Sequence, residues 1–299
     1  MTLFGAIEAG GTKFVCAVGY ANGEIKDKVS IPTTTPDETM PEVLAFFQKH
    51  QVEAIGIGSF GPIDVNKKSG TYGNITTTPK LAWKDYPLLE TVKKAFSVPV
   101  EFNTDVNAAA LGEAILGAAK GVDSCLYITI GTGIGAGAYI QGELLQGLTH
   151  PEMGHILVRR HPEDTFTGRC PYHGDCLEGL ASGPAIEARW GTSAKHLSEK
   201  EEVWDIEGYY IAQALMQYIL ILSPERIILG GGVMNQSHVF SAIYKYLQEF
   251  LNGYLAFPEL SSNMAEYIVK PGLGDQAGIT GAILLAKKAW NESKEFVIK

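Results

Sequence analysis

Hydrophobic positions alternate with polar or small ones in three short runs near the start of the chain. Residues 3–7, 14–19 and 28–31 follow this alternation, and breaks at Gly10-Gly11 and Asn22-Gly23 separate them. A period of two is typical of strands with one buried face, and Asn-Gly is a strong turn signal. The pattern therefore predicts three strands that form an antiparallel meander.

Beyond residue 32 the hydrophobic pattern switches between helical and strand spacing. Thr35-Pro36 is a typical helix start, and apolar residues at 43, 44, 46 and 47 supply one buried stripe. The order strand, strand, strand, helix, strand, helix occurs roughly twice. Further strands are predicted near residues 54–58, 98–102, 124–130, 136–140, 226–229 and 267. Further helices are predicted near residues 106–119, 180–189, 207–222, 237–251 and 275–290.

This repetition predicts an α/β fold of two related lobes. With 299 residues the chain exceeds the usual size of one compact domain, and 45% hydrophobic residues suffice for sizeable cores. We expect an N-terminal α/β lobe at residues 1–115 and a C-terminal α/β lobe at residues 116–299. The last helix is expected to pack back on the first lobe.

The charge and hydropathy of the chain limit the kinds of partner and the location that we expect. A formal net charge of −9, without a long run of Lys and Arg, predicts no nucleic-acid partner. The first residues lack the basic region of a signal peptide, and the apolar stretch at 211–222 is too short to span a bilayer. We expect a cytoplasmic protein without a membrane segment.

Two glycine-rich turns stand out between predicted strands. They lie in Glu8-Ala9-Gly10-Gly11-Thr12-Lys13 and in the run from Gly131 to Gly137. A dinucleotide-binding turn or a Walker loop opens a helix, whereas both of these turns lead into strand-like sequence. Two hairpin turns are the alternative, which one copy alone would favour. Two copies beside Thr and Lys indicate instead that backbone N–H groups approach phosphate.

A third glycine run follows the strand near residues 226–229. An adenine ring could lie against this bare backbone, or the run could be a tight connection to the next helix; its sequence favours neither. Because an acidic protein repels ATP at long range, Mg²⁺, a lysine and aimed N–H groups would have to hold the triphosphate. The predicted nucleotide-binding residues are Gly10, Gly11, Thr12, Lys13, Thr132, Gly133, Gly230, Gly231 and Gly232.

Asp105 is the candidate general base. It lies where a strand hands over to an Ala-rich helix, which is where ligands of open α/β sheets bind. A helix N-cap is the alternative, and position alone favours it. Polar groups elsewhere and a Gly-Pro loop at residues 59–62 favour the catalytic interpretation, because together they could hold a sugar. The predicted substrate-binding residues are Asn103, Glu152, His155, Glu178 and Gly61.

Four potential metal ligands gather in the segment that lacks clear periodicity. Cys170, His173 and Cys176 form Cys-x-x-His-x-x-Cys, and His155 precedes them. Four N and S ligands suit tetrahedral zinc, and the loop has no hydrophobic means of ordering itself. Exposed thiols and surface histidines are the alternative. We expect a structural zinc ion, with the second ring nitrogen of His155 free to meet substrate.

These motifs together resemble the ROK family (repressors, open reading frames and kinases), and within it the bacterial fructokinases. The match covers Glu8 to Lys13, Asn103 to Glu113, Gly131 to Gly137, Glu152-Met153-Gly154-His155 and Cys176-Leu177-Glu178-Gly179. Two positions depart from the common pattern. Most relatives carry Asp at the position of Glu8. The usual zinc loop is Cys-x-Cys-x4-Cys, whereas here His173 replaces one thiolate in Cys-x-x-His-x-x-Cys.

The resemblance implies an actin-like ATPase (ribonuclease H-like) fold, with a ligand cleft between the lobes and a homodimer as the assembly. It implies a kinase that uses ATP, Mg²⁺ and structural Zn²⁺ to phosphorylate D-fructose to fructose 6-phosphate, with Asp105 as the base. A mannose, glucose or N-acetylhexosamine kinase is the runner-up. A sugar-binding sensor module is the alternative without catalysis.

Overall fold

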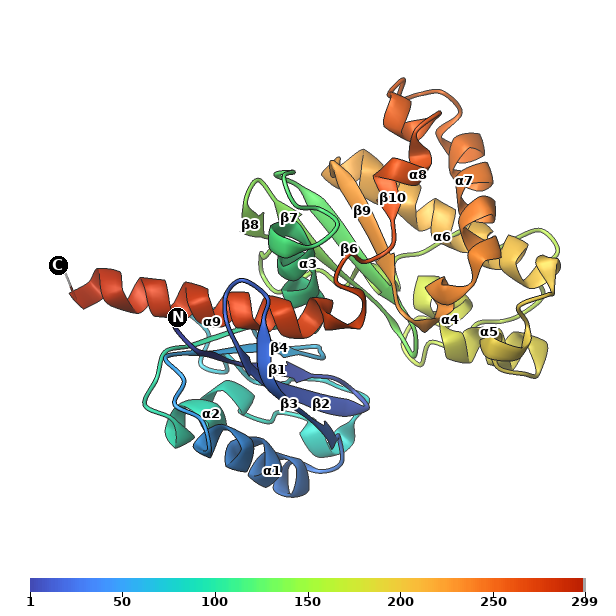
Figure 1. Ribbon diagram of the computed structural model, residues 1–299. Coiled ribbons are helices and arrows are strands. Elements are labelled where there is room, and N and C mark those ends of the chain that lie inside the picture. Colours follow the sequence, from blue (N-terminus) through green and yellow to red (C-terminus); the bar gives the residue numbers. More distant parts are fainter. Residues whose placement is uncertain (298–299) are drawn as a thin grey trace. The chain divides into compact units, whose positions relative to one another are not determined.

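The computed structural model describes residues 1–297 (Figure 1). The chain divides into two compact units, which we describe separately. Unit 1 combines Met1–Gly121, Gly137–Pro151 and Gly272–Lys299, and unit 2 combines Val122–Ala136 and Glu152–Pro271. The division into lobes at residues 1–115 and 116–299 stays a prediction.

The first sheet has five strands in the order β3-β2-β1-β4-β5. Strands β1 to β3 pair antiparallel, whereas β4 runs parallel to both β1 and β5. The predicted meander is therefore confirmed, and the strand after the first helix joins its other edge. The bounds are β1 Phe4–Ala9, β2 Lys13–Gly19, β3 Ile25–Pro32, β4 Ile55–Ser59 and β5 Val100–Thr104.

Helices cover both faces of this sheet (Figure 1). Helices α1 (Pro36–Gln48) and α2 (Leu88–Ala95) pack on one face with fully enclosed aromatic residues such as Trp83. Helix α9 (Ala277–Val297) packs on the other face through Ile279, Ala282, Ile283 and Ala286. Alternation along β1 explains both cores, because Ile7 and Ala9 face the first and Phe4 and Ala6 face the second.

The second sheet repeats this design in the order β10-β9-β6-β7-β8. Strand β6 is parallel to β9, β9 is parallel to β10, and β7 is antiparallel to β8, as in the first sheet. The predicted fold class, two related α/β lobes of the actin-like ATPase type, is confirmed. The bounds are β6 Cys125–Ile130, β7 Ile134–Ile140, β8 Glu143–Leu144, β9 Arg226–Gly230 and β10 Ile268–Val269.

The remaining helices differ from the sequence expectation at several ends. The predicted helix 180–189 is two helices, because Pro184 is tolerated only in the first turn of a new helix after Ser182. Helix α6 begins six residues before the predicted start, and α2 was not predicted at all. The bounds are α3 Asp105–Leu116, α4 Leu177–Ala181, α5 Gly183–Trp190, α6 Glu201–Leu222, α7 Ser237–Leu251 and α8 Met264–Tyr267.

A buried carboxylate fixes two segments of unit 1 where they border unit 2 along the chain. Glu113 in α3 is fully enclosed, and its oxygens accept hydrogen bonds from the backbone N–H groups of Ala118, Gly272 and Leu273 at 2.7–2.9 Å. Ala118 lies shortly before the first segment of unit 2, and Gly272 and Leu273 directly follow its last segment. Glu113 therefore ties both of these chain segments to α3.

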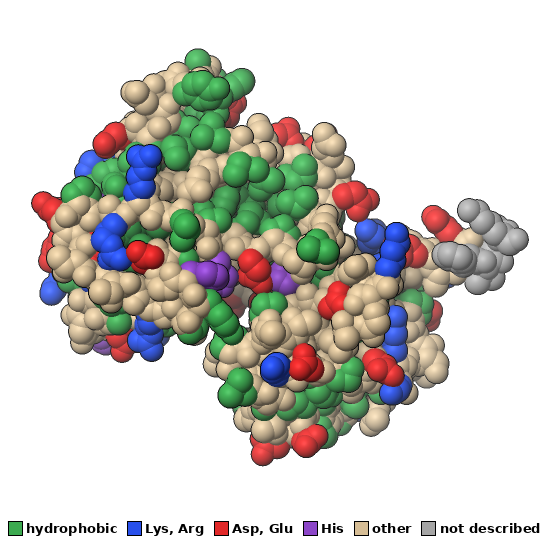
Figure 2. Space-filling model, turned by 180° about the vertical axis from the view of Figure 1, so that it is seen from behind, with side chains coloured by type: hydrophobic (Ala, Val, Ile, Leu, Met, Phe, Trp, Pro, Cys, Tyr) green, Lys and Arg blue, Asp and Glu red, His purple; other side chains and the backbone are tan. Residues whose placement is uncertain are grey.

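The surface mixes charges of both signs on one face (Figure 2). On the face that Figure 2 shows, Lys and Arg side chains are scattered among acidic ones and form no basic stripe. Within residues 1–297, no helix combines the length and the apolar character that crossing a bilayer requires.

Candidate functional site

The carboxyl ends of three parallel strands assemble the predicted residues of unit 1. Ala9 in β1, Ser59 in β4 and Thr104 in β5 lie side by side in register. The residues that follow them therefore emerge at one edge of the sheet. They are the first glycine turn, the loop with Gly61, and Asp105, as the sequence predicts for a ligand site.

The first glycine turn is closed by short backbone hydrogen bonds. The N–H of Gly10 donates to the carbonyl of Lys13 at 3.0 Å, and the Thr33 hydroxyl donates to the carbonyl of Gly10 at 2.7 Å. Thr12 and Lys13 are exposed. These two hydrogen bonds hold the backbone of the turn in place. The Thr12 hydroxyl and the Lys13 ammonium group lie on its exposed side.

Glu8 lies in β1 two residues before this turn. Burial raises the pKa of its carboxyl group to about 7, and the nearby Asp275 carboxylate adds to the effect. The ammonium groups of Lys13 and Lys28 oppose the shift. A further cation beside Glu8 would favour the ionised form in the same way.

Asp105 is the first residue of α3, but it is not the N-cap. The Thr104 hydroxyl takes that role by accepting a hydrogen bond from the Asn107 N–H at 3.0 Å. The half-buried Asp105 carboxylate accepts from the Val106 N–H at 2.8 Å. The capping alternative for Asp105 is therefore wrong, and its carboxylate lies at the positive end of the α3 dipole, where negative charge is favoured.

Asn103 precedes Asp105 by two residues and is almost fully buried at 3% exposure. Its Oδ1 accepts hydrogen bonds from the Thr104 N–H and from the Asn107 side chain, both at 2.9 Å. Substrate would therefore meet the Nδ2 group of Asn103 and not its carbonyl oxygen.

His150 is a residue of this edge that the sequence did not single out. Its buried imidazole accepts a hydrogen bond from the Ile63 N–H through Nε2 at 3.1 Å, and it borders Gly61 next to the cis Gly61-Pro62 peptide. Burial lowers the pKa of His150, which keeps Nε2 an acceptor. The only signal was its place in Thr149-His150-Pro151, just before the Glu152 motif.

In unit 2 the second glycine turn meets the glycine run after β9. The N–H of Gly131 donates to the carbonyl of Gly133 at 2.9 Å, and the Gly183 N–H at the start of α5 donates to the carbonyl of Gly131 at 2.8 Å. Gly232 lies beside Gly131, and Gly231 has a positive φ of 91°. A 3-10 turn, Gly232–Asn235, separates this run from α7. Two predicted nucleotide segments thus come together.

The predicted sugar-binding residues of unit 2 also come together. The Glu178 Oε1 lies 3.9 Å from the Nε2 of His155, and its Oε2 accepts from the Ile134 N–H at 2.9 Å. Partial burial and the charge of Glu178 raise the pKa of the Glu152 carboxyl group to about 7. Glu178 therefore connects the acidic sugar-binding candidates to the strand that follows the second glycine turn.

The four predicted metal ligands converge. The ligand atoms of His155, Cys170, His173 and Cys176 all lie within 4.8 Å of one another. The Nδ1 of His155 is 3.7 Å from the sulfur of Cys170 and 3.5 Å from that of Cys176. A tetrahedral ion with zinc–ligand lengths of about 2.0–2.3 Å separates N and S ligands by roughly 3.6 Å. The cluster fits zinc, and the Nε2 of His155 points away toward Glu178.

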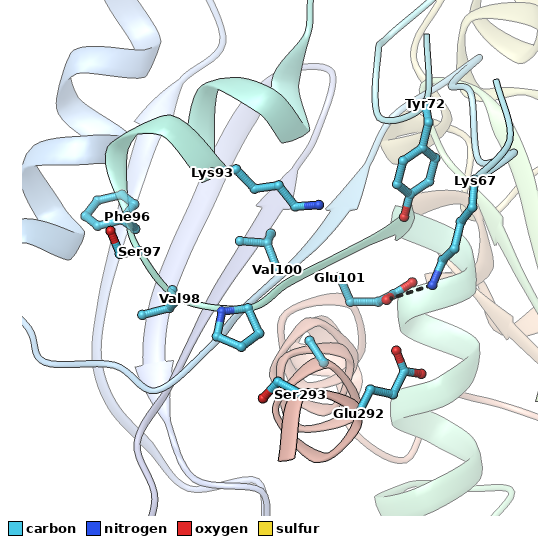
Figure 3. Close-up of a pocket in the computed structure, with 12 residues that line it drawn as sticks. Lys67, Tyr72, Lys93, Phe96, Ser97, Val98, Val100, Glu101, Glu292 and Ser293 are labelled. Carbon is cyan, nitrogen blue, oxygen red and sulfur yellow. Dashed lines mark hydrogen bonds and ion pairs between the residues drawn. The ribbon is translucent and has the colours of Figure 1, made fainter. Parts of the chain in front are cut away.

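A separate hollow of about 520 Å³ lies in unit 1 and is shown in Figure 3. Val100 and Glu101 line it from the first residues of β5, whereas Asn103 and Thr104 end that strand. The Lys67 ammonium and the Glu101 carboxylate form an ion pair across it at 3.2 Å. None of its lining residues is a predicted site residue, so this hollow is distinct from the edge described above.

One known family spans nearly the whole sequence. The sequence pattern of the ROK family matches residues 4–289. This chain belongs to the ROK family. Its ROK membership confirms the resemblance, and the predicted ROK motifs lie at the edge of the first sheet, at the second glycine turn and in the metal cluster.

Relatives of similar length accompany this ROK match. A Bacillus subtilis (strain 168) protein is 63% identical, with 96% of both chains covered. The fructokinase of Pediococcus pentosaceus is 50% identical, with 96% of this chain and 98% of that protein covered. The crystal structure of a ROK hexokinase from Thermus thermophilus superposes with a TM-score of 0.80 at 27% identity, covering 97% of this chain and all of the other.

Proposed function

We propose that this protein is an ATP-dependent fructokinase, which converts D-fructose to fructose 6-phosphate. The observation that carries the proposal is the 50% identity to a fructokinase over nearly the full length of both proteins. The convergence of Asn103, Asp105 and the first glycine turn at one sheet edge supports it, because a hydroxyl, a base and phosphate must meet in such a reaction.

Asp105 is the general base of the proposed reaction. Its carboxylate accepts the proton of the fructose 6-hydroxyl while that oxygen forms a bond to the γ-phosphorus. The bond from the γ-phosphorus to the bridging oxygen breaks in line, and ADP leaves with the bonding electrons. The position at the N-terminus of α3 is one where negative charge is favoured, as a carboxylate base requires.

We expect the sugar contacts to come from the predicted substrate-binding residues. Asn103 offers its Nδ2 group, and the backbone at Gly61 approaches the sugar. Glu152, His155 through Nε2, and Glu178 accept or donate hydrogen bonds to hydroxyls. Several simultaneous hydrogen bonds orient one hydroxyl for attack, which is where most of the rate of such a reaction comes from.

Two metal ions belong to the proposal. Zn²⁺, held by His155, Cys170, His173 and Cys176, would fix the loop and orient the imidazole of His155. Mg²⁺ would neutralise phosphate charge, and Glu8 suits it as a carboxylate beside the first glycine turn, in direct contact or through water. The glycine turns and Lys13 supply the remaining N–H groups and positive charge.

The setting of the protein completes the proposal. A location in the cytoplasm agrees with thiolate metal ligands, which a reducing compartment preserves. The homodimer is expected from the resemblance to the family. Light scattering on the purified protein measures the mass of the assembly directly, and a monomer would contradict this part.

A coupled assay of ADP release tests the function. We expect turnover with fructose that exceeds turnover with mannose, glucose and their N-acetylamino relatives. Higher kcat/KM for mannose or glucose would support the runner-up kinase. Sugar binding without ADP release would support a sensor module.

A further inference from the structure

Lys80 lies over the first glycine turn, although the sequence motifs do not include it. A Cβ atom added to Gly11 would be 3.1 Å from the Cε atom of Lys80. The ammonium group is one bond beyond Cε, which brings it within reach of the turn. A side chain at position 11 would require Lys80 to shift.

The segment that carries Lys80 is held firmly. Trp83 is fully buried, and its indole N–H donates to the carbonyl of Thr34 at 2.7 Å. The N–H of Trp83 donates to the carbonyl of Lys80 at 2.8 Å. Lys80 itself is half-buried, and its own N–H donates to the Thr78 hydroxyl. The backbone beneath the ammonium group is therefore fixed before any ligand arrives.

The same tryptophan connects two parts of the proposed site. Its ring packs against Phe14, with ring centres 5.0 Å apart, and against Phe60 at 6.1 Å. Phe14 follows Lys13 directly, and Phe60 precedes Gly61 directly. Lys80 thus belongs to a segment that is anchored both to the phosphate turn and to the loop expected to meet the sugar.

No carboxylate of the described residues forms an ion pair with Lys80. A half-buried lysine with no acidic partner among the described residues, beside a turn of backbone N–H groups, is suited to an anion. Lysine is a common point-charge ligand of phosphoryl groups.

We propose that Lys80 contacts the phosphoryl group that is transferred: the γ-phosphoryl of ATP before the reaction and the 6-phosphate of the sugar product after it. This inference rests on the proposed function. The transferred phosphoryl is the phosphate that must neighbour both the glycine turn and the sugar, and Lys80 is anchored to both segments. ADP lacks this group, so Lys80 contributes little to ADP binding.

The test replaces the charge and keeps the aliphatic chain. We expect Lys80→Met to lower kcat by about 100-fold, the effect of removing one charge-stabilising group from a transition state. We expect the affinity for fructose 6-phosphate, measured by calorimetry, to fall at least about tenfold, while that for ADP changes by less than about threefold. Lys84→Met is the matched control, because Lys84 is exposed on the same segment.

Lys80→Arg separates charge from packing. It keeps the positive charge, so we expect it to retain fructose 6-phosphate affinity within about tenfold of the wild type. Values for Lys80→Met that match those of Lys84→Met would overturn the inference. It would also be overturned if Lys80→Arg lost as much affinity as Lys80→Met, or if Lys80→Met weakened ADP and fructose 6-phosphate equally.

The outcome for Lys80 is separable from the outcome for the proposed function. If the wild-type protein prefers another hexose, the same comparison with that hexose and its 6-phosphate still decides the role of Lys80. If the wild type releases ADP with fructose and Lys80→Met does so equally well, only the inference about Lys80 fails.

Discussion

At the scale of single residues, the start of α3 separates a helix cap, Thr104, from the proposed general base, Asp105. Thr104 caps α3, so the Asp105 carboxylate is not needed for that purpose. We expect Asp105→Ala to lower kcat by about 100-fold or more, the usual loss for a positioned base, with an unchanged melting temperature. ADP release and calorimetry measure both quantities.

A structural role alone for Asp105 predicts the opposite pattern. In that case kcat would stay near the wild-type value while the melting temperature fell. Thr104→Ala is the matched variant, because it removes the cap and leaves the base, and should cost about 1 kcal/mol of stability.

Glu207 is the residue whose burial has the clearest effect on stability. It is fully enclosed in α6, and neither of its carboxylate oxygens has a hydrogen-bond partner among the described residues. Burial raises the pKa of Glu207 well above its usual range, although Arg189 opposes this. The folded state therefore favours the protonated acid.

The sign of the resulting pH dependence follows from linkage. Because the pKa of Glu207 is higher in the folded than in the unfolded chain, its stabilising contribution is present below the unfolded value near 4.5 and is lost as the pH rises above it. We expect Glu207→Gln to raise the melting temperature by a few degrees at pH values well above 4.5 and to flatten its decline as the pH rises from there. Scanning calorimetry at several pH values provides the measurement.

Glu202→Gln is the control for this prediction, because Glu202 is exposed on the same helix. It should leave the pH profile unchanged. A profile of Glu207→Gln parallel to that of the wild type would show that Glu207 stays ionised in the folded protein.

At the scale of elements, the metal loop stands between irregular sequence and α4. An isolated bridge between Cys170 and Gly174 is part of this loop. Its exposed residues form no hydrophobic core that could order it. We expect Cys170→Ser to lose about one zinc ion per chain and to lower the melting temperature markedly, because metal binding supplies the folding energy of such loops. Elemental analysis and calorimetry measure these changes.

His196→Asn serves as the control for metal loss, since His196 is an exposed histidine outside the cluster. It should retain the metal. Full stability and activity of a metal-free wild-type protein would exclude a structural zinc ion.

Helix α4 begins directly after the last metal ligand and carries Glu178 toward the second glycine turn. The hydrogen bond from the Ile134 N–H to Glu178 ties this helix to the strand after the turn. Glu178→Ala should therefore raise KM for ATP as well as KM for fructose. Glu178→Gln keeps an acceptor oxygen for Ile134 and should raise mainly KM for fructose. Steady-state kinetics with each substrate varied in turn distinguish the two.

Equal effects of both Glu178 variants on KM for ATP would show that the hydrogen bond to Ile134 does not position the turn. An Ala variant with an unchanged KM for fructose would remove Glu178 from the sugar site.

Elements with strong periodicity were predictable from sequence, and those set by tertiary packing were not. The meander and α7 follow their patterns closely. Helix α2 has only eight residues, too few for a clear helical pattern in the sequence. Its stability comes from burial of Leu88, Leu89 and Val92 on the first core. His150 and Lys80 reach the site from segments without a motif, so contacts across the fold alone reveal them.

At the scale of the whole molecule, each unit is completed by parts distant in sequence. The meander of the first sheet was predictable from its alternation and turns, whereas the places of the later strands in both sheets were not predicted. The candidate site of unit 1 lies where the three parallel strands β1, β4 and β5 end together. The convergence of the metal ligands was predictable because their spacing alone suits one ion.

The packing of α9 on β1 and β4 has a consequence for biosynthesis. The first strands to leave the ribosome expose one apolar face until Ile279, Ala282 and Ile283 have been translated. All of unit 2 is synthesised within that interval. The earliest part of the nascent polypeptide is therefore the last to be fully enclosed, and a chaperone would find its uncovered strands throughout translation.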